Sequence, residues 1–242
     1  MRYYYDLHIH SCLSACADDD MTPCNIAGMA SLNGLNILAL TDHNSTANCP
    51  AFFKACKKYG IIPVAGIELT TAEEIHMIIL FQDLESAMAF DSELEQYKMK
   101  IKNKPDIFGN QLILDECDNV VGSEEYLLSV ATSLDLFSAT ELAKAYDAVI
   151  YPAHIDREAN GIVSILGSWP CSPEFTSCEF ASREKTEEYV SRFSLQNKNL
   201  VLSSDAHNLW NINDNVNYFE IDDSDGYSSA SVRAKLISLL KQ

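Results

Sequence analysis

The sequence predicts an α/β fold built as a closed barrel, and three observations lead to this class. Short apolar segments typical of buried strands alternate with amphipathic segments typical of helices. Seven or eight such units follow one another, which favours a closed barrel over an open sheet. The chain has 242 residues, of which 47% are hydrophobic and 21% charged, and this composition suits one domain with a sizeable core. We therefore expect a single domain spanning residues 1–242.

The strands of this barrel are expected where short apolar runs rich in β-branched and aromatic residues occur. Four are predicted in the first third of the chain, at residues 2–8, 36–41, 61–69 and 75–81. Four more are predicted later, at residues 148–153, 175–180, 200–203 and 218–221. Between these groups, two short apolar runs flank an Asp118-Asn119 turn, which predicts a hairpin over residues 111–121.

Helices are expected where a capping residue precedes an amphipathic stretch. Thr22 and Pro23 have the residue types of an N-cap and a first turn, and the helix that they begin should stop at Gly34. Ser138 and Glu141 have the spacing of a capping box before a short helix. Further helices are predicted at residues 48–59, 86–102, 183–196 and 228–240.

Charge and composition bear on partners and location. With 35 acidic and 17 basic residues the net charge is −18, so long nucleic acid is disfavoured and a small anionic substrate held by metal ions fits better. No apolar run approaches membrane-spanning length, and the first residues do not resemble a signal peptide. The eight cysteines form no CxxC pair, which favours reduced thiols and a cytoplasmic protein.

Residue types that bind metal ions gather at the predicted strand ends. His8 and His10 end the first strand and lie two residues apart, so both imidazoles point the same way on an extended backbone. All six histidines and three acids belong to this pattern: His8, His10, Asp42, His43, Glu68, His76, His154, Asp205 and His207. Because the strands of a barrel end on one face, we expect these side chains to meet in one site.

The chemistry of this set points to phosphoester hydrolysis. Imidazole and carboxylate are ligands for Zn, Mn and Fe, and nine such groups are too many for one ion. A carboxylate such as Glu68 can bridge two ions. Ions ~3.5–4 Å apart can bind the attacking and the leaving oxygen at phosphorus, and they lower the pKa of a bound water. The pattern therefore predicts a metal-dependent phosphoesterase in which metal-bound hydroxide attacks phosphorus.

At these residues the sequence resembles the PHP superfamily, the polymerase and histidinol phosphatase domain. The resembling motifs are Asp6-Leu-His8-Ile-His10-Ser11, Thr41-Asp42-His43-Asn44, Gly66-Ile-Glu68, Glu74-Ile-His76, Pro152-Ala-His154 and Ser204-Asp205-Ala-His207. The resemblance implies a distorted (β/α)7 barrel with a bi- or trinuclear site at the C-terminal ends of the strands. It implies two or three divalent ions as cofactors, of Zn, Mn or Fe.

The resemblance also implies a division of the ligands among three ions. One ion would be held by His8, His10, Glu68 and Asp205. A second would be held by Glu68, His76 and His154, and a third by His43, His207 and one residue of the loop after His10. Asp42 would support a ligating histidine from behind.

The loop ligand is where the chain departs from the family pattern. Many members place an Asp or His seven or eight residues after the first histidine of the site. Counting from that histidine selects Cys16, and counting back from the Thr22-Pro23 helix start selects Asp18, with Asp20 close by. A thiolate would favour zinc, whereas a carboxylate leaves manganese or iron open. We expect Asp18 or Asp20 ahead of Cys16.

The expected reaction is hydrolysis of a small phosphomonoester or a short phosphodiester. Arg157, three residues after His154, could clamp a phosphate, and Arg183 is an alternative. Arg157 and Asp42 are the residues expected to assist catalysis. A segment at about 103–136 lies outside the motifs and is interpreted as an insertion or cap. Two alternatives stay open: an oligonucleotide-trimming nuclease, and a non-catalytic regulatory module stabilised by metal.

Overall fold

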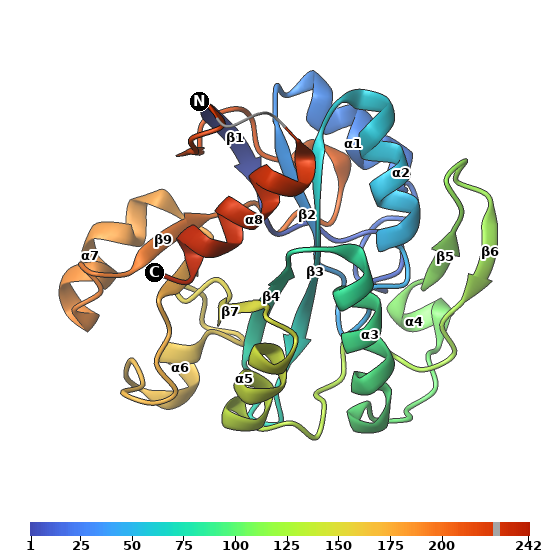
Figure 1. Ribbon diagram of the computed structural model, residues 1–242. Coiled ribbons are helices and arrows are strands. Elements are labelled where there is room, and N and C mark those ends of the chain that lie inside the picture. The colour runs from blue at the N-terminus through green and yellow to red at the C-terminus, as the bar shows by residue number, and fades with distance from the viewer. Residues whose placement is uncertain (225–227) are drawn as a thin grey trace.

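A curled sheet of six strands forms the centre of the molecule (Figure 1). The structure is a computed structural model, and it describes residues 1–224 and 228–242. The strand order is β10-β1-β2-β3-β4-β7. The bounds are β1 (Arg2–Asp6), β2 (Ile37–Leu40), β3 (Ile62–Thr70), β4 (His76–Phe81), β7 (Val149–Pro152) and β10 (Tyr218–Glu220). The predicted α/β class is therefore confirmed.

Two further strands, β8 (Ser177–Phe180) and β9 (Asn199–Leu202), pair in parallel and form a separate small sheet. Single backbone hydrogen bonds link them to the residues that follow β7 and β1. Ile155 N–H donates to Glu179 O at 2.9 Å, and His10 N–H donates to Ala206 O at 3.0 Å. The main sheet thus curls as a half-barrel whose two sides approach β8 and β9.

The direction of β4 differs from the predicted repeat of parallel strands. β4 pairs antiparallel with both of its neighbours, β3 and β7. The connection from β3 is a tight turn over residues 71–75, in which Thr71 N–H donates to Ile75 O at 2.9 Å. A parallel connection needs a crossover of a dozen or more residues, so this short turn imposes the antiparallel direction.

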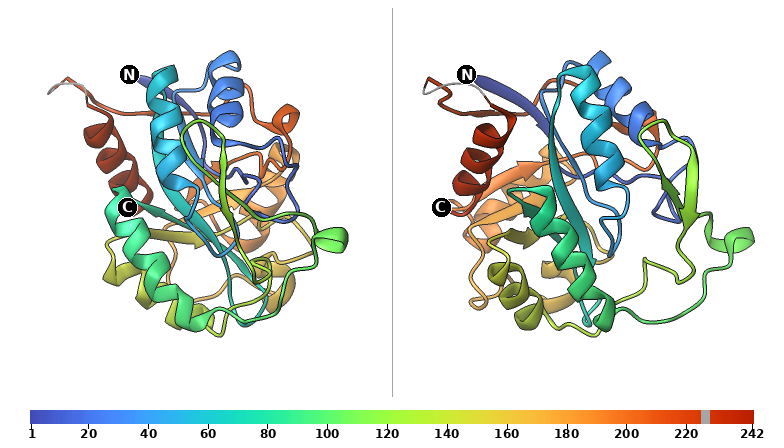
Figure 2. Two further views of the ribbon diagram at one scale, coloured as in Figure 1. Left: turned by 90° about the vertical axis from the view of Figure 1, so that its right-hand side faces the viewer. Right: turned by 45° about the vertical axis from the view of Figure 1, so that its right-hand side comes forward.

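Helices pack around the curled sheet (Figure 2). They are α1 (Pro23–Leu32), α2 (Cys49–Tyr59), α3 (Leu84–Leu94), α5 (Leu136–Ala145), α6 (Ile162–Leu166), α7 (Arg183–Phe193) and α8 (Ser229–Leu240), with 3-10 turns at η1 (Glu95–Tyr97) and η2 (Leu209–Asn211). The predicted start of α1 is confirmed, since the Thr22 side chain accepts from Asn25 N–H at 3.3 Å. Among residues 1–224 and 228–242, no helix is long and apolar enough to cross a bilayer.

The strands face two separate apolar cores, as their alternating side chains require. On β2, Leu38 and Leu40 pack in the core between the sheet and the outer helices. Ile37 and Ala39 point the other way, into a second core inside the curl. Helix α8 contributes Leu236 and other apolar side chains to this inner core and so covers one end of the curl.

Two predicted helix boundaries were wrong. The helix predicted over residues 86–102 ends with η1 at Tyr97, and the chain beyond it is extended, with Leu127 N–H donating to Ile101 O at 2.8 Å. The predicted capping box does not form, because α5 begins earlier. Asp135 is the N-cap, and its carboxylate accepts from Ser138 N–H at 2.7 Å.

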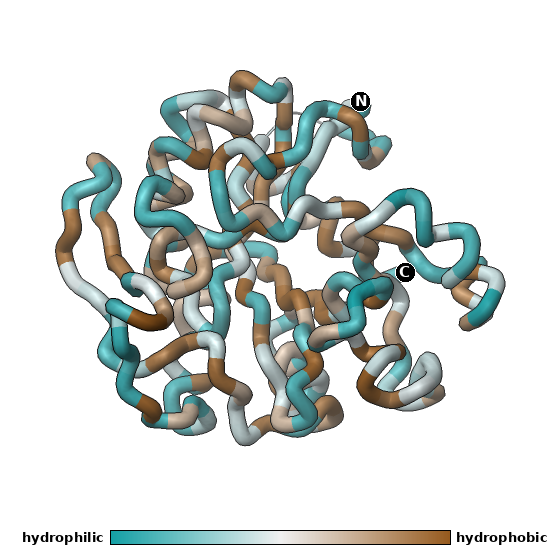
Figure 3. The backbone as a smooth tube through the Cα atoms, turned by 180° about the vertical axis from the view of Figure 1, so that it is seen from behind, coloured by the Kyte–Doolittle hydropathy of each residue, from teal (hydrophilic) through white to brown (hydrophobic). Residues whose placement is uncertain are grey.

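The predicted hairpin is confirmed as β5 (Leu112–Leu114) and β6 (Val120–Ser123), which pair antiparallel after the short helix α4 (Pro105–Phe108). The hairpin stands outside the main sheet (Figures 1 and 2). Apolar segments run through the interior strands and also along this hairpin at the edge (Figure 3). Val120 and Val121 are exposed there. The hairpin therefore lies outside the core, and hydrogen bonds hold it against the rest of the chain, among them Leu112 N–H to Cys12 O at 2.8 Å and Leu114 N–H to Asn48 Oδ1 at 2.9 Å.

Candidate metal centre

Glu68, on β3, lies at the centre of a buried polar cluster. Its two carboxylate oxygens are within 3.4 Å of ring nitrogens from five histidines: His76 Nδ1 at 2.8 Å, His43 Nδ1 at 3.0 Å, His154 Nε2 at 3.1 Å, His10 Nε2 at 3.2 Å and His8 Nε2 at 3.4 Å. One carboxylate cannot hydrogen-bond five rings at once. The arrangement therefore brings many electron-pair donors into one small volume.

Asp205 is the second carboxylate of the cluster. Its Oδ1 lies 3.1 Å from His8 Nε2 and 3.0 Å from His10 Nε2. The sixth histidine, His207, lies beside it with Nδ1 at 3.6 Å from the same oxygen. We call Glu68, Asp205 and the six histidines the Glu68 cluster.

The strands explain how residues far apart in the sequence meet here. β1, β2 and β3 run parallel: Glu68 lies on β3, His8 and His10 follow β1, and His43 follows β2. The other members of the cluster are His76 at the start of β4, His154 after β7, and Asp205 and His207 after β9. His43, just beyond β2, forms an isolated bridge with Glu68 on β3. Asn44 N–H donates to Glu68 O at 3.0 Å and continues this pairing. The parallel register therefore brings the imidazole and the carboxylate to the same level of the sheet.

Two members of the cluster have an unusual backbone conformation. His154 has a φ of 25° and Asp205 has a φ of 51°, both positive. Non-glycine residues rarely adopt positive φ, and such strain concentrates at functional sites. The backbone conformation of His154 directs its imidazole toward Glu68, and that of Asp205 directs its carboxylate toward its imidazole partners. Both conformations cost local backbone strain.

Three overlapping sets of atoms are close enough to hold metal ions. The sets, each within 4.8 Å, are His8-His10-Glu68-Asp205, His43-Glu68-His76 and His10-His43-His207. The first is the ligand set that the family resemblance implied for one ion. In the second, His43 takes the place given to His154, whose Nε2 nevertheless lies 3.1 Å from Glu68.

The unpaired atoms of the cluster fit metal ligands. His43 Nδ1, His76 Nδ1 and Asp205 Oδ1 are buried and make no hydrogen bond of acceptable geometry. They nevertheless lie about 3 Å from oppositely charged partners. Two ligands of one zinc ion, each at roughly 2.0–2.2 Å, are separated by about this distance. Buried polar atoms are seldom left unpaired, so a shared cation accounts for them well.

Several side chains of the cluster have strongly shifted pKa values. Burial favours the neutral form of Glu68, but the charges of His76 and His8 outweigh it and hold its pKa well below the usual range. Burial also opposes protonation of His10, yet its hydrogen bond to Asp205 raises its pKa to about 9. Burial lowers the pKa of His207 to about 4. The inner imidazoles are therefore paired with carboxylates, whereas His207 stays neutral.

Two partners of the cluster were not found from the sequence. Glu179 on β8 is buried, and its Oε1 lies 2.8 Å from His8 Nδ1. The same oxygen accepts from His154 N–H at 3.2 Å. Ser14 Oγ lies 3.0 Å from His10 Nδ1. A glutamate within an apolar strand is a signal that could have revealed Glu179, whereas nothing in the sequence marks Ser14.

Asp42 is buried next to the cluster but contacts none of its rings directly. Its carboxylate accepts from Ser11 N–H, Ser11 Oγ–H and Ser14 Oγ–H, each at 2.7 Å. Asp42 thus supports the loop behind His10 and lies too deep to touch a substrate. Arg157, in contrast, pairs with Asp205 through a side chain that is 43% exposed.

The loop candidates for a third ion remain at the edge of the site. None of Cys16, Asp18 and Asp20 belongs to a set that could hold an ion within the described part of the chain. All three are exposed. The Cys16 side chain is close enough to His43 to contribute to the raised pKa of that ring. The structure therefore does not bring Asp18 or Asp20 into the cluster, although these were the residues preferred from the sequence.

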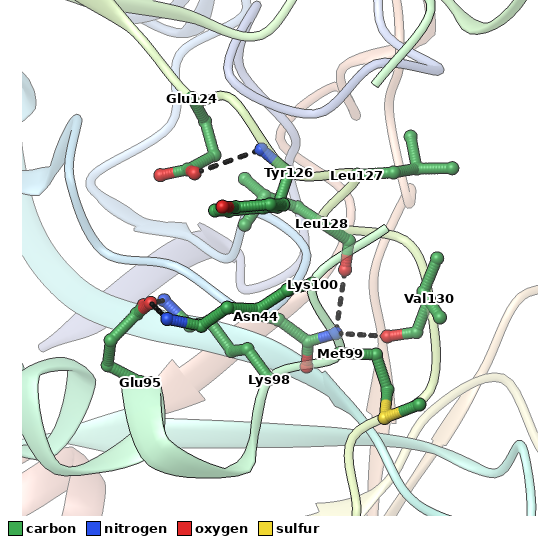
Figure 4. Close-up of a pocket in the computed structure, with 10 residues that line it drawn as sticks. All are labelled: Asn44, Glu95, Lys98, Met99, Lys100, Glu124, Tyr126, Leu127, Leu128 and Val130. Atoms are coloured by element: carbon green, nitrogen blue, oxygen red, sulfur yellow. Dashed lines mark hydrogen bonds and ion pairs between the residues drawn. The ribbon is translucent and has the colours of Figure 1, made fainter. Parts of the chain in front are cut away.

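One flank of the site is formed by the segment that includes the hairpin. Asn44, next to His43, donates from Nδ2 to Leu128 O at 2.7 Å and to Val130 O at 3.0 Å (Figure 4). The pocket around these groups is narrow, with a cavity volume of about 10 Å³, and Lys98, Lys100 and Tyr126 are among its lining residues. This pocket adjoins the cluster through Asn44 but does not contain its ligand atoms.

Residues 6–123 match the family model described as PHP domain. This part of the chain therefore resembles a PHP domain. A 5′-3′ exoribonuclease of Haemophilus influenzae is 36% identical over 81 residues, which are 32% of this chain and 28% of that protein. This chain spans less than two thirds of the curated relatives that it matches, with between 7% and 60% of their lengths covered.

Solved structures with the same fold include two of similar likeness. A lesion-specific endonuclease from Pyrococcus furiosus has a TM-score of 0.60 at 19% identity, covering 86% of this chain and 49% of the endonuclease. A protein from Bifidobacterium adolescentis, assigned as a metal-dependent phosphoesterase, has a TM-score of 0.60 at 15% identity, covering 97% and 96% of the two chains. At these identities the likeness shows the PHP-type fold alone.

Proposed function

We propose that the protein is a metal-dependent hydrolase of phosphoester bonds. The observation that carries this proposal is Glu68, a buried carboxylate with ring nitrogens of five histidines within 3.4 Å. Asp205 adds a second carboxylate that faces two of the same rings. The PHP domain match over residues 6–123 supports the same class of chemistry.

The cluster has enough donors for two or three ions of Zn, Mn or Fe. The ions would polarise a phosphoryl oxygen and lower the pKa of a water molecule. Glu68 and Asp205 would balance their charge, and the buried imidazoles would exclude bulk water around them. His43 and His207 would hold the third ion, and Cys16 rather than Asp18 or Asp20 is our candidate for its remaining protein ligand, because its thiol is in range of His43.

Arg157 is the residue best placed to meet a phosphate. Its guanidinium is partly exposed and pairs with Asp205, so it lies at the accessible side of the cluster. An arginine can donate two parallel hydrogen bonds to phosphate oxygens. Asp42 would act only indirectly, through Ser11 and Ser14, whose hydroxyls donate hydrogen bonds to its carboxylate.

The substrate is proposed to be a small phosphomonoester or a short phosphodiester. The expectation that long nucleic acid is disfavoured is not supported, because the matching relative from Haemophilus influenzae is a 5′-3′ exoribonuclease. A structure of the same fold is an endonuclease in complex with a 27-mer duplex substrate. A nuclease is therefore the second candidate, and the net charge of −18 does not exclude it.

Three further features belong to this proposal. β8 and β9 would complete a distorted (β/α)7 barrel, with the cluster at the C-terminal ends of the strands. The segment at about 103–136 would cap the site and select the substrate. All eight cysteines are free thiols, which is consistent with a cytoplasmic protein.

The test is turnover by protein loaded with Mn²⁺. The substrates are p-nitrophenyl phosphate, bis-p-nitrophenyl phosphate and a short single-stranded RNA. His8→Ala and Glu68→Ala should each lower kcat/KM by at least ~10³-fold, because charge stabilisation by the ions amounts to several kcal/mol. The exposed Glu141→Ala is the control and should keep full activity. Full activity in both cluster variants would contradict the mechanism, and cleavage of RNA alone would select the nuclease.

A further inference from the structure

A fully buried serine links Asp42 to the Glu68 cluster. Ser14 Oγ lies 2.7 Å from Asp42 Oδ1, 3.1 Å from His43 N and 3.0 Å from His10 Nδ1. Ser14, like His10, has no solvent exposure. The hydroxyl therefore has three partners and no room for water, so its single proton must be assigned among them.

The direction of each hydrogen bond follows from counting protons. A hydroxyl donates once and accepts at most twice. The backbone N–H of His43 can only donate, so it takes one lone pair of Ser14 Oγ. An Asp42 carboxylate can only accept, so the Ser14 proton points to Oδ1. One lone pair of Ser14 Oγ remains, and it faces His10 Nδ1, which must then carry a hydrogen atom.

The surroundings of Asp42 support its role as acceptor. Ser11 Oγ receives hydrogen bonds from Leu13 N–H at 3.2 Å and Asn48 Nδ2–H at 2.9 Å. Both of its lone pairs are therefore used, and its own proton goes to Asp42 Oδ2 at 2.7 Å. Asp42 Oδ1 also accepts from Ser11 N–H at 2.7 Å. Both carboxylate oxygens of Asp42 accept hydrogen bonds from Ser11. Asp42 therefore acts as the acceptor toward Ser14 as well, and Ser14 donates its proton to Asp42 Oδ1.

The hydrogen atom on Nδ1 also determines the state of Nε2, the nitrogen of His10 that faces the proposed metal site. With hydrogen on Nδ1, the lone pair of neutral His10 is on Nε2, which lies 3.0 Å from Asp205 Oδ1 and 3.1 Å from His8 Nε2. His8 is oriented in the same way by Glu179 at its own Nδ1. Two Nε2 lone pairs so close together repel each other unless a cation lies between them.

We propose that Ser14 is a positioning residue through which Asp42 fixes the tautomer of His10, so that Nε2 is the ligand atom. His10, like His43, belongs to two of the ion-holding sets, so Ser14 influences both sets that contain His10. Outer partners of this kind typically contribute 10- to 100-fold to metal affinity. The inference rests on the metal centre of the proposed function and is independent of its substrate.

The first test uses the unaltered protein loaded with Zn²⁺, which is diamagnetic. Long-range ¹H–¹⁵N correlation spectra of protein labelled with ¹⁵N-histidine distinguish the two tautomers of each ring. His10 should carry its hydrogen on Nδ1, with Nε2 shifted as a metal-bound nitrogen. A His10 ring with its hydrogen on Nε2 would overturn the inference whether or not any variant folds.

The second test compares Ser14→Ala with Ser11→Ala. Both serines are fully buried and donate to Asp42, but only Ser14 contacts an imidazole. Competition with a chelator should show Zn²⁺ affinity reduced about 10- to 100-fold in Ser14→Ala and less than about threefold in Ser11→Ala. Equal losses of Zn²⁺ affinity in the two variants, or no loss in Ser14→Ala, would overturn the proposal that Asp42 acts on His10 through Ser14. Correct tautomer and affinities without phosphoester turnover would sustain this inference and refute the proposed function.

Discussion

The inner and outer halves of the Glu68 cluster differ in how firmly their ligands are held. In the inner half, His8 and His10 are fully buried, and each has a partner behind its ring, Glu179 or Ser14. In the outer half, the His207 side chain is 29% exposed, and its Nδ1 faces only the backbone oxygen of Asp205 at 2.8 Å. Cys16, the loop candidate for this half, is also exposed.

This difference indicates that the two halves bind ions with different strengths. A ligand whose ring is fixed from behind loses little conformational freedom when an ion binds. A ligand on an exposed loop must be ordered at that moment, which costs free energy. We therefore expect a tightly held inner ion and an outer ion that exchanges readily.

The largest effect is expected from removal of Glu68, which belongs to two of the three ion-holding sets. Glu68→Ala leaves several imidazoles without their buried counter-charge and should eliminate ion binding together with activity. His207→Ala removes a ligand from the outer set only and should lower the metal content by one ion per chain. Metal analysis by mass spectrometry after gel filtration measures both. Equal ion loss in the two variants would show that the halves do not differ.

A second, smaller effect is expected behind the inner ligands. Glu179→Ala removes the acceptor of His8 Nδ1 and of His154 N–H, so the inner ion should bind about 10- to 100-fold more weakly. The exposed Glu187→Ala, on α7, is the matched control and should bind as the unaltered protein does. Affinities from chelator competition give the measurement. If Glu179→Ala bound the inner ion with normal affinity, fixing of the His8 ring by Glu179 would not explain why the two halves bind ions with different strengths.

The residues proposed as ligands can be located from the sequence because strand ends are visible in it. Short apolar runs followed by His, Asp or Glu mark β1, β2, β3 and β7, and the parallel pairing of β1, β2 and β3 brings the ends of these three together. The hairpin β5–β6 was also predicted, since its turn residues have a local conformational preference. Such features depend on neighbours in the chain.

Features that depend on distant contacts escaped prediction. Ser14 and Glu179 matter because of the rings that they face, and Ser14 looks like any loop serine in the sequence. The antiparallel direction of β4 depends on a turn whose Glu74 has a φ of 65°. The loop ligand was predicted by counting residues, and counting cannot show that Asp18 and Asp20 are exposed and lie outside the ion-holding sets.

The pH dependence of ion binding offers a third way to separate the halves. In the ion-free protein, burial opposes protonation of His43, but the charge of Glu68 outweighs it and raises the pKa to about 9. Its hydrogen bond to Asp205 likewise raises the pKa of His10 to about 9 against the effect of burial. These rings are therefore protonated at pH 7.5, and an ion must displace their protons. Burial keeps the pKa of His207 at about 4, so this ring has no proton to release.

Affinity for the ions should accordingly rise as the pH increases from about 6.5 toward 9, by up to about tenfold per pH unit for each proton displaced. The ion-free fold should change in the opposite sense. The pairing of protonated His10 and His43 with carboxylates stabilises it fully below the unfolded pKa of about 6.5, and this contribution is lost as the pH rises through about 9. Calorimetry at pH 7.5 in buffers of different ionisation enthalpy counts the released protons. His207→Ala should lower that number by no more than the one proton that the outer ion displaces from His43, because His207 itself has no proton to release, and a larger drop would contradict this assignment.

The smallest effect is expected at the contact that holds the outer loop in place. Gly109 has a φ of 102°, and a Cβ added there would lie 2.1 Å from Ala15 O, within the loop that includes Cys16. Gly109→Ala must push this loop away as well as strain its own backbone, at roughly 1–3 kcal/mol for the strain alone. Gly60→Ala is a matched control, because Gly60 has a φ of 69° but nothing within 4 Å of the added Cβ. Both variants should melt at lower temperature, by roughly 2–4 °C for each kcal/mol lost.

Only Gly109→Ala should also weaken the outer ion, since only this substitution displaces the loop beside His43 and His207. The inner ion should be retained in both variants, because its ligands do not depend on the hairpin segment. Ion stoichiometry across a chelator titration, with melting curves of the same samples, tests the two statements together. Loss of the inner ion in Gly109→Ala would mean that the halves are mechanically coupled through Ser14, which lies on the displaced loop and supports His10 from behind.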